Sequence, residues 1–93
     1  MITNDRWQTF VPRDQLGHIA TEILRAKYAT NEQTRQTILE RAFELIDLTL
    51  SDPKWRMNPL LLLVLRADLA KIYVREVSDE WQVTALDKII AAI

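Results

Sequence analysis

Apolar residues recur along this 93-residue chain at intervals of three and four positions, the spacing that places side chains on one face of an α-helix. The chain contains a single glycine, which is a poor supply for the turns that connect β-strands. Both features predict an all-α fold with one domain. We expect helices at about 13–29, 32–51, 59–76 and 79–93, after an extended lead-in over residues 1–12.

The lead-in is expected to be extended because Pro12 disfavours helical backbone angles in the residue before it. Its two aromatic residues, Trp7 and Phe10, are then expected to lie over the bundle. In the first helix, Gly17 falls at the margin of the apolar stripe. A glycine there would allow the backbone of a neighbouring element to approach closely.

The second and third helices have recognisable ends. Thr30 or Asn31 stops the first helix and caps the second, and Pro53 ends the second because proline cannot continue the hydrogen-bond ladder. Asn58 followed by Pro59 is typical of a helix start. The connections are short, which makes consecutive helices antiparallel neighbours. The expected architecture is a small antiparallel four-helix arrangement made of two helical hairpins.

The boundary between the last two helices is less sharply defined. Asp79 with Gln82 matches a capping box, and Ser78 is another candidate cap. These residues favour a break near 77–79. No glycine or proline lies between Val77 and Ile93, so one continuous helix from Pro59 onward is the alternative.

The third helix is more apolar than an ordinary surface helix. Its apolar side chains cover roughly 240° of its circumference, whereas a surface helix needs about 100°. We therefore expect it to be central in the fold or to form an oligomer interface, in a chain that self-associates as a homodimer. The expected interface residues are Leu60, Leu63, Val64, Arg66, Ala67, Tyr73, Val74 and Val77.

Arg66 is a charge within this apolar arc, where arginine is seldom buried without a partner. Its aliphatic stem could pack while the guanidinium stays in water. It could instead pair with Glu76 or Asp79 of a second chain, or bind a ligand. The sequence leaves these three explanations open.

Charge and composition narrow the function classes. The formal net charge is −1, so the chain lacks the basic surplus typical of proteins that bind nucleic acid or anionic membranes. It has no cysteine, which excludes disulfides and thiolate chemistry. The first residues are polar and no apolar run reaches the roughly 18 residues of a membrane span. We expect a cytoplasmic protein without a membrane segment.

Two rows of ionisable residues were considered as metal or partner sites. Asp14, His18 and Glu22 are spaced by four on the first helix, but they come from one helix only and lie on the face opposite Leu16 and Ile23. We interpret them as a solvated face. The second row is acidic and is interpreted in the same way, with a patch for a basic partner as the alternative. Its members are Glu40, Glu44 and Asp47.

Catalytic signatures are absent from the sequence. There is no glycine-rich phosphate loop, no dinucleotide fingerprint and no pairing of a nucleophile with a base. We expect neither an enzyme nor a metal or other cofactor. Lys54-Trp55-Arg56 places an aromatic ring between two cations, a group that can stack on a nucleobase. Lys71 and Arg75 could extend it, although Trp55 as a plug at the end of the bundle is the simpler interpretation.

The sequence therefore favours a non-enzymatic protein–protein interaction module, such as a small adaptor, assembly factor or regulatory subunit, that self-associates through its apolar third helix. A protein partner is expected, of an identity that the sequence does not specify. The alternative is a nucleic-acid-associated regulator that uses the Lys54-Trp55-Arg56 loop.

Overall fold

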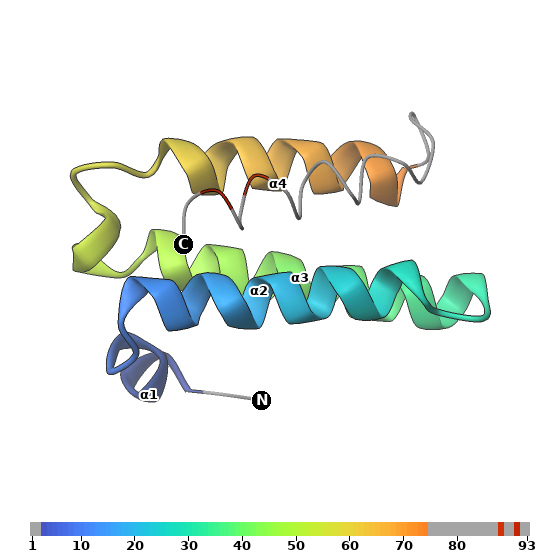
Figure 1. Ribbon diagram of the computed structural model, residues 1–93, viewed down its shortest axis with the longest axis horizontal. Helices are drawn as coiled ribbons and strands as arrows, with labels where there is room; N and C mark the ends of the chain where they lie inside the picture. Colours follow the sequence, from blue (N-terminus) through green and yellow to red (C-terminus); the bar gives the residue numbers. More distant parts are fainter. Residues whose placement is uncertain (1–2, 75–87, 89–90, 92–93) are drawn as a thin grey trace.

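The computed structural model describes residues 3–74, 88 and 91 of the chain and has an all-α fold (Figure 1). Its elements are α1 (Asn4–Gln8), α2 (Pro12–Lys27), α3 (Glu32–Leu50), the short 3-10 helix η1 (Pro53–Trp55) and α4 (Leu60–Tyr73). The three long helices lie within one to three residues of the first three predicted helices at each end. Of the predicted fourth helix, only Lys88 and Ala91 are described, and both are helical.

The long helices alternate in direction. In Figure 1, α2 and α3 run antiparallel side by side, α4 runs antiparallel to α3, and α1 lies across the end where α2 begins. α3 is the central element, because it contacts α2, α4, α1 and η1. The third predicted helix was expected to be central or to form an oligomer interface. Among the described residues α3, and not α4, has the central position. The break near 77–79 lies outside the described residues.

The lead-in contains a helix rather than an extended segment. Thr3 caps α1 by accepting a hydrogen bond from the backbone N–H of Arg6 at 3.3 Å, and Asp5 lies in the first turn, where a negative charge is favourable. Val11 is extended, as expected before a proline. The backbone restriction before a proline acts on Val11 only, so it does not prevent Thr3 from capping a helix earlier in the lead-in. Trp7 is 1% exposed and belongs to the core.

The core is built from one stripe of each long helix. Buried apolar positions recur three and four residues apart, as the sequence pattern predicts. The stripes comprise Leu16, Ile19, Ile23 and Ala26 of α2, then Ile38, Leu39, Ala42 and Ile46 of α3, then Leu62, Leu65, Leu69 and Ile72 of α4. Each fully buried leucine or isoleucine contributes roughly 1.5–3 kcal/mol to the stability of the fold.

The start of α3 is capped as the sequence predicts. Asn31 accepts a hydrogen bond from the N–H of Thr34 at 2.8 Å.

Three charged side chains among the described residues are also buried, namely Arg35, Asp68 and Asp52. Arg35 of α3 donates to the carbonyl oxygen of Ile72 at 2.9 Å and to Glu32 at 2.9 Å. It therefore satisfies one of the last carbonyls of α4, which the helix itself leaves without a donor. Asp68 of α4 accepts from the ammonium of Lys88 at 2.5 Å. The ammonium of Lys88 makes the burial of the Asp68 carboxylate tolerable.

Gly17 faces open space rather than a neighbouring backbone, because a Cβ added there meets no atom within 4 Å. The close approach expected from the sequence is therefore wrong.

We predict that Gly17→Ala raises the free energy of unfolding by about 0.5–1 kcal/mol, since alanine is the better helix former and creates no clash. Thermal unfolding followed by circular dichroism measures this as a rise in Tm. Gly17→Ser should give a smaller rise, and an unchanged or lower Tm in Gly17→Ala would contradict the prediction.

Candidate functional site

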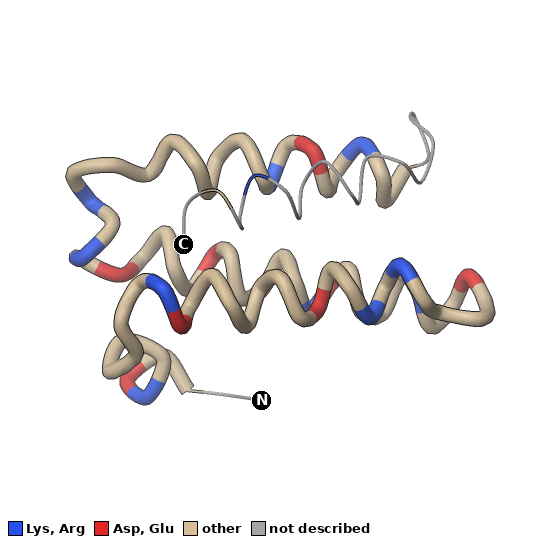
Figure 2. The backbone as a smooth tube through the Cα atoms, in the orientation of Figure 1, with Lys and Arg blue, Asp and Glu red and all other residues tan. Residues whose placement is uncertain are grey.

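The outer side of α4 carries an apolar stripe that the rest of the described chain leaves uncovered. Leu60, Leu63 and Val74 are 65%, 50% and 61% exposed. Ala67 is also exposed and Val64 is half-buried. We call Leu60, Leu63, Val64, Ala67 and Val74 the α4 stripe. Leu60 to Leu65 carry no charge (Figure 2), so no charged side chain interrupts this part of the stripe.

The other expected interface residues lie elsewhere. Arg66 donates from Nε to Asp47 of α3 at 2.9 Å, and its guanidinium lies 5.4 Å from the centre of the Phe43 ring. Its ion pair therefore forms within the chain, with the guanidinium at the surface. The hydroxyl of Tyr73 donates to Glu40 at 2.9 Å. Both residues join α4 to α3 and flank the stripe, whereas Val77 lies outside the described residues.

These contacts also account for the acidic row of α3. Glu40 and Asp47 each accept a hydrogen bond from α4, while Glu44 is exposed. The Tyr73 ring meets Phe43 edge to face with the ring centres 5.9 Å apart. The hydrogen bond to Glu40 raises the pKa of the Tyr73 phenol, because it stabilises the protonated form. Most of the row thus takes part in packing between α3 and α4.

The Lys54-Trp55-Arg56 segment closes one end of the bundle. The Lys54 ammonium donates to Asp52 at 2.7 Å and to the carbonyl oxygen of Gln8 at 2.6 Å. The indole N–H of Trp55 donates to Gln15 at 2.7 Å, and its ring packs on the core. Arg56 is exposed. Two of the three residues are therefore engaged by contacts within the chain.

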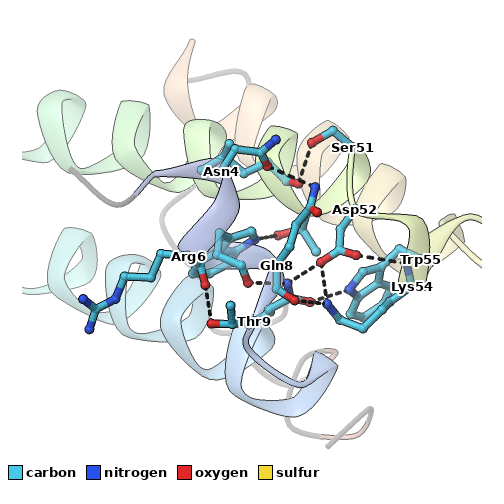
Figure 3. A network of polar contacts seen from close by, with 12 residues as sticks. Asn4, Arg6, Gln8, Thr9, Ser51, Asp52, Lys54 and Trp55 are labelled. Carbon is cyan, nitrogen blue, oxygen red and sulfur yellow. Dashed lines mark hydrogen bonds and ion pairs between the residues drawn. The ribbon is translucent and has the colours of Figure 1, made fainter.

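A buried polar network surrounds this segment (Figure 3), and sequence reasoning missed it. Gln15 of α2 is fully buried, and its amide N–H group donates to the carbonyl oxygen of Trp7 at 3.1 Å and to Asp52 at 2.8 Å. The indole N–H of Trp7 donates to Thr49 of α3 at 3.0 Å. Buried polar atoms need such partners, and these come from four different elements. The only sign of this network in the sequence is the position of Gln15, which faces inward one residue before the buried Leu16.

The polar row of α2 is not simply solvated. His18 stacks on Phe10 with ring centres 5.2 Å apart and an angle of 21° between the planes, and Trp7 lies 5.7 Å from it. Glu22 pairs with Arg25 at 2.9 Å. α1 folds over this row, which the expectation of an extended lead-in did not anticipate. Within the described part of the chain, no group of three His, Cys, Asp or Glu side chains could hold a metal ion.

The carboxyl of Asp52 has a pKa below its ordinary value of 3.8. Burial alone would raise it, but hydrogen bonds from Lys54 and Gln15 and the positive charge of Lys54 together outweigh that effect. A folded-state pKa lowered in this way adds stability above the unfolded-state value, and the stability is lost as pH falls through the folded-state value.

We predict that Asp52→Asn lowers the free energy of unfolding by about 1–2 kcal/mol at neutral pH, because it removes the charge-assisted bonds. The difference from the wild type should shrink as pH falls below the ordinary pKa of Asp52, since the wild type then loses the same charge. Urea unfolding at a series of pH values measures it. Glu44→Gln, at an exposed position, is the control and should change little. A difference that stays constant down to about pH 2.5 would argue against the prediction.

No described helix has both the length and the apolar character needed to cross a membrane. Comparison with protein-family models, with curated protein sequences and with solved structures found no significant match. The function of the chain is therefore inferred from its own geometry, in which the apolar α4 stripe is exposed.

Proposed function

We propose that the chain is a non-enzymatic protein–protein interaction module that self-associates through the α4 stripe. The observation that carries this proposal is that α4 is apolar on two sides, with its inner side buried in the core and its outer side exposed. A contiguous exposed apolar surface is unfavourable in water and typically marks an interface. As a small adaptor, assembly factor or regulatory subunit, the module would act by burying this stripe.

The spacing of the stripe favours a second copy of the chain as its occupant. Leu60 and Val74 each lie seven residues from Ala67, and Leu63 lies four residues before it. Leu60 and Val74 therefore form a symmetric pair about Ala67, whereas the position that mirrors Leu63 is Lys71. An antiparallel copy of α4 would place Leu60 of each chain beside Val74 of the other, with Ala67 at the two-fold axis. Alanine at the crossing point lets two helix axes approach to about 8 Å.

The charged side chains of α4 also favour the antiparallel arrangement of the two copies. In a parallel pair, Lys71 of one copy would face Lys71 of the other, and like charges at such distances repel. In the antiparallel pair, Lys71 lies near Leu63 of the other copy, where its aliphatic stem can cover apolar surface while the ammonium stays in water. The antiparallel arrangement therefore avoids repulsion without a change in the fold.

The length of the stripe determines the affinity that we expect for the dimer. Fourteen residue steps of α-helix from Leu60 to Val74 span about 21 Å. One helix pair of this length buries less than the roughly 800 Å² per partner of a standard interface. We therefore expect a dimer of micromolar affinity, which could exchange its second copy for an amphipathic helix of a partner protein.

The alternative, a nucleic-acid-associated regulator, finds less support. It requires Lys54 and Trp55 to face a ligand, but their polar groups are engaged by Asp52, Gln8 and Gln15. Trp55 also packs against the core, so less of its ring is available for base stacking. No arrangement of the described residues favours this function over the interaction module.

We predict that the wild type forms a dimer at high micromolar concentration and that Leu63→Glu shifts it to the monomer of 10.9 kDa, because two carboxylates would enter the apolar contact. Sedimentation velocity over a concentration series from about 5 to 500 µM measures this. Leu24→Glu is the matched control, since Leu24 of α2 is 44% exposed and lies outside the stripe. A wild type that stays monomeric at the highest concentration would sink the proposal.

A second prediction tests the register. The chain has no cysteine, so a single engineered cysteine reports one contact. Ala67→Cys should form a disulfide-linked dimer under mild oxidation, because the two-fold axis brings both copies of residue 67 within the reach of a disulfide. Leu60→Cys should link to Val74→Cys in a mixture but not to itself. If the wild type dimerises while Leu60→Cys links efficiently to itself, the pair is parallel and the antiparallel register is wrong.

A further inference from the structure

α1 and the polar side of α2 enclose a cavity that is separate from the α4 stripe. Its volume is about 590 Å³, and its lining comes from α1, α2, the turn between them and one residue of α3. Pockets that bind small molecules typically measure about 300–1,000 Å³. α4 contributes no lining residue, so this cavity and the stripe are independent features of the molecule.

The apolar part of the lining is aromatic, and its rings are held in place by one another. Trp7 is fixed by burial and by its hydrogen bond to Thr49. Phe10 meets Trp7 edge to face at 5.7 Å and stacks on His18 at 5.2 Å. All three rings line the cavity. Since their mutual packing limits their movement, the cavity offers a preformed aromatic surface to a planar ligand.

The charged part of the lining has a positive surplus. Arg6 and Arg25 both line the cavity, and Glu22 is its one carboxylate. Arg25 donates to one oxygen of Glu22 at 2.9 Å, and the other oxygen of Glu22 is buried and accepts no hydrogen bond. Among the described residues, Arg6 makes no ion pair, and Figure 3 shows its side chain extended away from the polar network. The cavity thus presents the guanidinium of Arg6, which has no ion pair among the described residues. Its one carboxylate, Glu22, is already paired with Arg25.

We propose that this cavity binds a small aromatic carboxylate. The ligand carboxylate would accept hydrogen bonds from the guanidinium of Arg6, with Arg25 adding positive charge at the same rim. The ligand ring would lie against Phe10 and His18. A cationic ligand fits less well, because Glu22 is already paired and its second oxygen is covered. Ligand binding here does not depend on self-association through α4.

The test is a titration of the isotope-labelled full chain with phenylacetate, followed by ¹H–¹⁵N correlation spectra. We expect saturable shifts of the amide signals of Phe10, His18 and Arg25, with a dissociation constant of about 1 mM or below. Phenylacetamide, which has the same shape without the charge, should bind at least fivefold more weakly. Acetate, which lacks the ring, should also bind at least fivefold more weakly.

Arg6→Gln should weaken phenylacetate binding at least fivefold, while Arg56→Gln, at an exposed position outside the cavity, should leave it unchanged. Spectra of both variants without ligand show whether the fold is intact. The proposal is overturned if phenylacetate causes no shifts at about 20 mM, if phenylacetamide binds equally well, or if the two arginine variants behave alike.

Discussion

The side-chain amide of Gln15 is the interaction on which the arrangement of the molecule depends most. It joins α2 to the carbonyl of Trp7, to Asp52 at the end of α3 and to the indole of Trp55 in η1. Through Trp7 it fixes α1 against the bundle, and through Asp52 it fixes the turn that leads into α4. A buried amide with a missing partner is destabilising, so the packing of each of these elements favours the packing of the others.

Both candidate binding features follow from this placement. Because α1 is anchored, it covers the polar side of α2 and encloses a cavity, where an extended lead-in would have left an open face. Because the turn after α3 is closed by η1, α4 packs with Leu62, Leu65, Leu69 and Ile72 inward. The remaining apolar side chains of α4 then point outward, since a helix with apolar residues on so much of its circumference cannot bury all of them against one neighbour.

The sequence predicted the parts of the structure that depend on local rules. The all-α fold, the ends of the long helices and the Asn31 cap follow from periodicity and from short-range hydrogen bonding. The exposure of Leu60, Leu63 and Val74 also agrees with the excess of apolar surface predicted for that helix. Features that depend on distant partners were missed. Gln15 and Asp52 are 37 residues apart, and no local pattern indicates that they meet in the interior.

The helical lead-in and the central position of α3 were missed for a related reason. The rule for the residue before a proline was extended to the whole lead-in, although it applies to Val11 alone. One expectation placed the most apolar helix, α4, at the centre of the bundle. The central helix is instead the one that neighbouring helices cover on the most faces. α3 is covered on more faces because it packs on α2, α4 and α1 at once.

Arg35 adds a long-range polar contact between the start of α3 and the end of α4, which Figure 1 shows at the end of the bundle away from the start of α2. Its guanidinium ties the start of α3 to the last turn of α4, while the turn after α3 holds the first turn of α4. These contacts hold α4 against α3 near both of its ends. Its outer side is therefore already oriented before a partner helix docks, which reduces the conformational entropy that docking would cost.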